Sequence, residues 1–125
     1  MIKYLAGAAT ASGDTVKTSL GTITLPAGAK QIIGVWCMAH GGAGDTTLEN
    51  VSGILELESP DVNLQPCQIP LEPLAVLTSG MASIPNKVWP MNVAVTTGVR
   101  VTGYVTMDQA LAINPSCRFG LVVEV

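Results

Sequence analysis

The side chains that could do acid–base or nucleophilic chemistry are few in these 125 residues and lie far apart. The one histidine, His40, opens the stretch HGGAGD, which ends at Asp45. A Ser/His/Asp or Cys/His mechanism would have to use His40, because histidine is the side chain whose ordinary pKa suits a general base near neutral pH. A small β-barrel enzyme is therefore one hypothesis, and unchanged function in a His40→Ala variant would remove it. The favoured interpretation is a loop residue at the end of a strand, so we expect no catalytic residue.

Motifs for a bound cofactor or metal are missing from the sequence. HGGAGD matches neither G-x-x-x-x-G-K-[ST] nor G-x-G-x-x-G, the spacings that hold phosphates at the start of a helix. Cys37, Cys67 and Cys117 are far apart and form no C-x-x-C pair, which excludes a tetrahedral zinc site. A cupin-type site would need several histidines. We therefore expect no cofactor and no metal, and thiols that act as small buried apolar side chains in a reducing compartment.

The carboxylates gather in one part of the chain. Glu56 and Glu58 alternate along one segment, with Glu49 before them and Asp61 after them. Carboxylate oxygens suit calcium, but no Asp-x-Asp-x-Asp-Gly spacing is present. Glycoside hydrolysis would need aromatic side chains to stack on the sugar, and the chain has only five. We interpret these carboxylates as the solvated face of an amphipathic strand or as partners in salt bridges between subunits.

The composition is poor in charge. Apolar residues make up 48% and charged residues only 12%, about half of the usual charged share, and the mean hydropathy is +0.45. The 14 Val, 8 Ile and 12 Thr favour strands. This composition excludes a coiled coil and a disordered chain. With only 15 charged side chains to cover a small domain, we expect part of the surface to be covered by other protein.

The net charge of −3 comes with six basic residues spread along the chain. No basic stripe or tail is present, so we expect no direct binding of nucleic acid. The opening MIKYLAGAATASG does not resemble a signal peptide, and no run approaches the roughly 18 apolar residues of a membrane span. We expect no membrane span and synthesis in the cytoplasm.

Hydrophobic alternation with a period of two dominates the chain, with glycine, proline and asparagine between the segments. Strands are expected at Thr15–Leu25, Lys30–Ala39, Val51–Glu58, Cys67–Leu71, Leu74–Thr78, Val88–Thr96, Gly98–Met107 and Arg118–Val125. The prolines around the two short segments predict edge strands or loops. The short link TTG predicts a hairpin between Val88–Thr96 and Gly98–Met107. Asp108–Ile113 could form one helical turn.

Such a pattern indicates an all-β fold, an antiparallel two-sheet sandwich. An eight-stranded jelly roll fits the length well. We expect an extended N-terminal arm at residues 1–14 and a single β-sandwich domain at residues 15–125. Trp36, inside the apolar run, is expected in the core.

The segments LPAGAKQIIGVWCMA, VSGILELES and GVRVTGYVTM, after a Thr/Ala/Gly-rich opening, resemble the small single jelly-roll subunits of viral and phage capsids and phage capsid decoration proteins. The resemblance covers the whole chain in style. Subunits that package RNA often carry a basic N-terminal arm, whereas this chain has only Lys3 and Lys17 in its first 20 residues. The resemblance therefore implies a shell around a separately enclosed genome, or a decoration role.

The leading hypothesis is a structural virion protein, a self-associating capsid or capsid-decorating subunit made in the host cytoplasm. Its partners would be copies of itself and other capsid subunits. The residues expected at interfaces are Ile2, Tyr4, Leu5, Trp89 and Tyr104. The alternative is a non-catalytic binding module of lectin or adhesin type, which would use Trp89, Tyr104 and loop carboxylates.

Overall fold

The structure, a computed structural model, describes residues 1–7, 10–11, 16–40, 49–65, 67–76, 88–107 and 116–125. Within these ranges the regular elements are all strands. They are β1 (Ile2–Ala6), β2 (Thr10–Ala11), β3 (Thr18–Thr24), β4 (Gln31–His40), β5 (Glu49–Glu58), β6 (Gln68–Val76), β7 (Trp89–Ala94), β8 (Arg100–Met107) and β9 (Ser116–Glu124). The predicted all-β class is confirmed.

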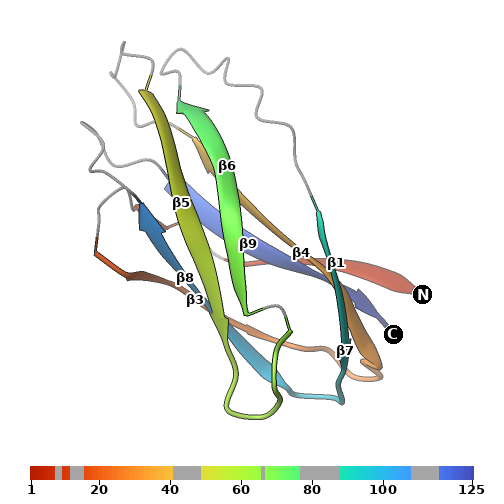
Figure 1. The fold of residues 1–125 in the computed structure, drawn as a ribbon. Helices are drawn as coiled ribbons and strands as arrows, with labels where there is room; N and C mark the ends of the chain where they lie inside the picture. The colour runs from red at the N-terminus through yellow and green to blue at the C-terminus, as the bar shows by residue number, and fades with distance from the viewer. Residues whose placement is uncertain (8–9, 12–15, 41–48, 66, 77–87, 108–115) are drawn as a thin grey trace.

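The strands form two antiparallel sheets that pack face to face as a sandwich (Figure 1). Sheet A has the order β1-β9-β4-β7, and β2 also pairs with β9. Sheet B has the order β3-β8-β5-β6. The predicted antiparallel two-sheet sandwich is therefore confirmed. Both sheets contain strands from both halves of the chain.

The strand pairs are nested along the sequence. β1 pairs with β9, β3 with β8, β4 with β7 and β5 with β6, so the partners approach one another from the two ends of the chain. The ends of the chain meet where the Met1 ammonium group donates to the carbonyl oxygen of Val125 at 3.0 Å. The Val125 amide donates in return to the Met1 carbonyl oxygen at 2.7 Å. Figure 1 shows the two termini side by side.

The core lies between the sheets and follows from the alternation of apolar residues. β9 contributes Phe119, Leu121 and Val123, all fully buried. Alternation also predicts that the apolar residues of the other strands point inward, and these residues are buried; they include Leu55 and Leu57 of β5, Met91 and Val93 of β7, and Val101 and Val105 of β8. Alternation fixes these positions because successive side chains of a strand point to opposite faces.

The predicted hairpin between Val88–Thr96 and Gly98–Met107 is wrong. β7 belongs to sheet A and β8 to sheet B, so the chain crosses from one sheet to the other at this link. The link bonds to the turn before β4 instead, through Val95 N to the Lys30 carbonyl oxygen at 3.0 Å and Gly98 N to the Leu25 carbonyl oxygen at 3.2 Å. Gly98 has a φ of 82°, a left-handed conformation that lets the chain turn there. A short link fits either connection, so its length could not decide between them.

The N-terminal segment also differs from the expected arm. Ile2–Ala6 is strand β1, paired along its whole length with β9 at the edge of sheet A. An edge strand needs little inward apolar surface, and in β1 only Leu5 packs against the core. The sequence of this segment therefore carries no clear strand pattern. Of the remaining expectations, the loop 41–45 and the helical turn at 108–113 lie outside the described residues.

The prolines of residues 70 and 73 predicted edge strands, and the structure places both in β6, at the edge of sheet B. The two short segments expected there are joined into this one strand, whose pairing with β5 shifts register between Val51 and Gly53. A register shift accommodates an extra residue in one strand of a pair. The two short strands expected from the sequence are therefore one edge strand with an irregular pairing to β5.

We predict that Phe119→Ala lowers the free energy of unfolding by about 3–5 kcal/mol, because it leaves a cavity at a fully buried position. Thr106→Ala, on the outward face of β8, should change it by less than about 0.5 kcal/mol. Urea denaturation followed by circular dichroism measures both. Similar values for the two variants would contradict the assignment of Phe119 to the centre of the core.

Candidate interaction surface

The outer face of sheet A, which points away from sheet B, has an apolar centre. Along β9 the fully buried inward residues alternate with four outward positions, Arg118, Gly120, Val122 and Glu124. Val122 is only 5% exposed even though it lies on this outer face. Neighbouring side chains must therefore cover it.

Two glycines allow large side chains to lie flat across this face. A Cβ atom at Gly34 would be 2.6 Å from Cγ1 of Val88 and 3.4 Å from Cγ2 of Val122, so Val88 occupies the space that a side chain would take. A Cβ atom at Gly120 would overlap the ring of Trp36. A residue with a Cβ atom at either position would clash with these side chains. Glycine at both positions therefore lets Val88 and Trp36 pack directly against the backbone on the outer face of sheet A.

The first strand extends the same surface to the sheet edge. Ile2 and Tyr4 pair with Glu124 and Val122, so their side chains share the outer face of sheet A. Ile2 is 54% exposed, Tyr4 72% and Val88 46%. We define the apolar patch as Ile2, Tyr4, Trp36, Val88 and Val122.

The polar groups of this face lie around the patch. Gln31 and Asn92 are hydrogen-bonded to each other through their side-chain amides on neighbouring strands. Arg118 and Glu124 lie at the two ends of the outward row on β9, and both are exposed. An apolar centre with a polar rim is the arrangement found in protein–protein interfaces.

The outer face of sheet B is polar by contrast. β3 presents Ser19, Thr22 and Thr24, and the Oγ1 atoms of Thr22 and Thr102 on β8 are 2.7 Å apart. The exposed apolar side chain on this face among the described residues is Ile54, at 41%. The two outer faces of the sandwich therefore differ in chemistry.

The carboxylates considered for calcium are already paired with a lysine. The Lys17 ammonium lies 3.0 Å from Glu58 Oε1 and 3.3 Å from Glu56 Oε2, where a cation would have to sit. The Glu58 hydrogen bond raises the pKa of Lys17. The same ammonium lies 4.5 Å from the centroid of the Tyr104 ring, a cation–π contact. Among the described residues no group of three His, Cys, Asp or Glu side chains could hold a metal.

Asp61 has a different partner and holds a loop. Its Oδ2 accepts a hydrogen bond from the backbone amide of Arg100 at 2.9 Å, and its carboxylate faces the guanidinium at 3.4 Å. The Arg100 side chain holds the pKa of Asp61 below its ordinary value. This contact ties the β5–β6 connection to the start of β8.

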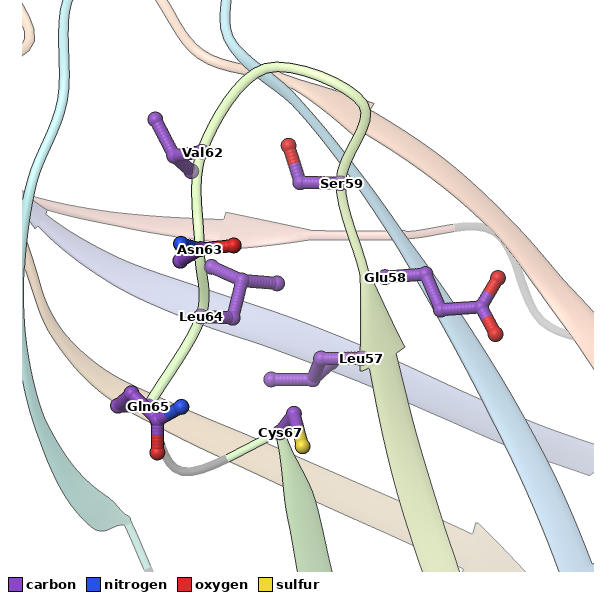
Figure 2. Close-up of a pocket in the computed structure, with 8 residues that line it drawn as sticks. All are labelled: Leu57, Glu58, Ser59, Val62, Asn63, Leu64, Gln65 and Cys67. Atoms are coloured by element: carbon purple, nitrogen blue, oxygen red, sulfur yellow. The ribbon is translucent and has the colours of Figure 1, made fainter.

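The β5–β6 connection curls around a hollow of about 440 Å³ (Figure 2). Leu57 and Leu64, both buried, form its apolar side, and Asn63 and Gln65 contribute amides. In Figure 2 the Glu58 carboxylate points away from the hollow. This carboxylate forms the salt bridge with Lys17. The lining therefore offers apolar surface, two amides, the Ser59 hydroxyl and the exposed Cys67 thiol.

The cysteines divide by burial. Cys117 is buried and Cys37 is half-buried against the core, whereas Cys67 is exposed at the start of β6. Burial raises the pKa of Cys37 to about 12, with a smaller contribution from Cys117, and it raises the pKa of Cys117 to about 11. Thiols with such values are neutral at physiological pH, so these two act as apolar side chains. The expectation of a buried thiol, which rests on the apolar surroundings of Cys37 and Cys117 in the sequence, holds for Cys117 and in part for Cys37, whereas Cys67 is exposed.

The five residues expected at interfaces lie on different surfaces. Ile2 and Tyr4 meet on the outer face of sheet A. Leu5 and Trp89 pack against the core, and Tyr104 lies on sheet B beneath Lys17.

The apolar patch also contains residues that sequence reasoning did not assign to it. Trp36 was expected in the core, but it lies half-buried on the outer face over Gly120. The available signal was the run KQIIGVWCMA, which does not alternate and is therefore apolar on both faces of its strand. Val88 and Val122 could not be found in this way, because their contact depends on which strands pair.

No helix in the described part of the chain is long and apolar enough to cross a membrane. No protein-family model matches this chain, and no curated protein matches it either. The function must therefore be inferred from the surfaces themselves.

We predict that one thiol of the folded protein, that of Cys67, reacts with a disulfide reagent at pH 8, and that all three react after unfolding. The reason is that the thiolate is the reactive form, and burial keeps Cys37 and Cys117 protonated. Absorbance of the released thiol measures the stoichiometry. Cys67→Ser should abolish the reaction of the folded protein, and rapid reaction of a second thiol would contradict the burial of the other two.

We predict that Asp61→Ala lowers the melting temperature at pH 7 and that the difference from wild type disappears in acid. Because the folded-state pKa of Asp61 is lowered, its stabilising effect is present above the ordinary carboxyl pKa of 3.8 and is lost as the pH falls through the folded value. Thermal unfolding at pH values from about 7 down to about 2.5, which lie on both sides of the ordinary carboxyl pKa, tests this prediction. A difference that does not depend on pH would assign the effect to loop packing instead.

Proposed function

We propose that this protein is a structural virion subunit that associates with copies of itself, as a capsid protein or a capsid-decorating protein. The apolar patch on the outer face of sheet A is the contact surface. On this proposal the chain is made in the host cytoplasm and ends in the virion, with itself and other capsid subunits as partners. Its work is to bury surface against neighbours.

The observation that carries the proposal is the chemical difference between the two outer faces. A sandwich needs one buried face per sheet, and sheet B follows this rule with threonine, serine and charged pairs outside. Sheet A exposes Ile2, Tyr4 and Val88 next to Trp36 on its outer face. A contiguous apolar area on a soluble domain marks a protein interaction site.

We further propose that the sandwich is a jelly roll. A jelly roll is a long antiparallel hairpin wound around a barrel axis, which pairs the first strand with the last and so on inward. The nested pairs β1–β9, β3–β8, β4–β7 and β5–β6 support this assignment, with β2 continuing the first strand along β9. Jelly rolls occur in viral capsids and in lectins, so the fold alone leaves both functions open.

The surfaces favour the coat function over the lectin-like alternative. The two aromatic residues expected at a sugar site are engaged elsewhere, because Trp89 packs against the core and the Tyr104 ring contacts the Lys17 ammonium. The carboxylates Glu56 and Glu58 hold the same lysine.

Electron microscopy of the purified protein in negative stain tests the proposed function. Shells, rings or regular small oligomers support a coat or decoration role. A protein that stays monomeric at about 1 mM, where even weak contacts form, would overturn it. Binding on a glycan array by such a monomer would support the lectin-like alternative.

We predict that Tyr4→Ser weakens self-association at least about tenfold, because each copy loses apolar area from the apolar patch. Tyr104→Ser is the matched control, since it removes the same side chain from the opposite face and should leave association unchanged. Sedimentation equilibrium from about 10 µM to about 1 mM gives both dissociation constants. Equal weakening by the two variants would contradict the choice of sheet A as the contact face.

A further inference from the structure

The outward row of β9 has opposite charges at its two ends. Arg118 and Glu124 are six residues apart on the same face, which places them about 20 Å apart along the strand. Within the described part of the chain neither side chain forms a salt bridge. Between them lie Gly120 under the Trp36 ring and Val122 of the apolar patch. The outward row of β9 therefore has a positive charge at Arg118, an apolar centre and a negative charge at Glu124.

When two copies of this row face each other in antiparallel directions, each positive end lies opposite a negative end. In a two-fold contact residue i of one copy meets residue j of the other, and j meets i in return. A two-fold axis near Leu121, the midpoint of the row, brings Arg118 of each copy opposite Glu124 of its partner. The same operation stacks the two apolar patches, and both ion pairs form at the rim of the contact.

The dimensions of the face are compatible with this packing. Packed sheets lie about 10 Å apart, a gap that an arginine and a glutamate side chain reaching toward each other can span. Four strands about 4.8 Å apart and about 20 Å long cover roughly 400 Å² on each copy. Specific interfaces bury about 800 Å² per partner, so this contact is weak alone and suits a subunit that has several neighbours.

We propose that two copies of this chain dock through the outer faces of sheet A about a two-fold axis, with the β9 strands antiparallel and Arg118 of each copy paired with Glu124 of the other. This assignment rests on the proposed self-association and specifies its geometry. The ion pairs fix the orientation, because a parallel arrangement would place like charges together at both ends.

A charge-swap experiment tests the pairing. Arg118→Glu and Glu124→Arg should each weaken the dimer at least about tenfold, because each places like charges opposite one another twice per dimer. The double variant Arg118→Glu/Glu124→Arg restores opposite charges and should return the dissociation constant to within about threefold of wild type. Thr24→Glu, which adds a negative charge to the outer face of sheet B, is the control and should leave the dimer unchanged.

Sedimentation equilibrium gives the dissociation constants, and circular dichroism with thermal unfolding checks that each variant is folded. A wild-type protein that is monomeric throughout would overturn both this geometry and the proposed function. Wild-type association with unaffected single variants would overturn the geometry alone. Weakened single variants without recovery in the double variant would also overturn the pairing of Arg118 with Glu124.

Discussion

The pairing of β9 with β1 on one side and β4 on the other is the interaction on which the remaining structure depends. Its inward residues, among them Phe119 and Leu121, form the centre of the core. Its outward residue Val122 lies in the apolar patch, and Gly120 leaves room there for the Trp36 ring. Because β9 is the last strand and β1 the first, this pairing also brings Met1 against Val125. The core, the apolar patch and the meeting of the two termini therefore all involve β9.

An apolar outer face is costly for an isolated domain, since the same strands must then be apolar on both sides. β4 and β9 carry apolar residues on both faces. The glycines at 34 and 120 let Val88 and Trp36 pack against the sheet. Sheet B is built differently, with threonine hydroxyl contacts and the Lys17 ion pairs on its outer face. Under the proposed function, the outer face of sheet A would lie toward a neighbour and the outer face of sheet B toward solvent.

Much of the fold was accessible from alternation. The inward and outward residues of β5, β7, β8 and β9 were predicted correctly, because each of these strands alternates clearly between a buried and a solvated side. The strand β1 was missed, since an edge strand with one inward contact carries little pattern. The hairpin between β7 and β8 was wrongly predicted because a short link can join strands in one sheet or in two. Pairing partners far apart in sequence leave no local signal.

The sequence by itself determined the all-β class, the inward faces of the strands and the shortage of charge. The first two properties depend on the alternation of apolar and polar residues along each strand, which is a local pattern. The third depends on composition, which is a total over the chain. Only the tertiary structure decided where the uncovered apolar area lies. Ile2, Trp36 and Val122 come from β1, β4 and β9, and Val88 directly precedes β7, so only the order β1-β9-β4-β7 makes them one patch. The same order placed Tyr104 on the opposite face, because strand pairing, and not residue type, decides which surface a side chain shares.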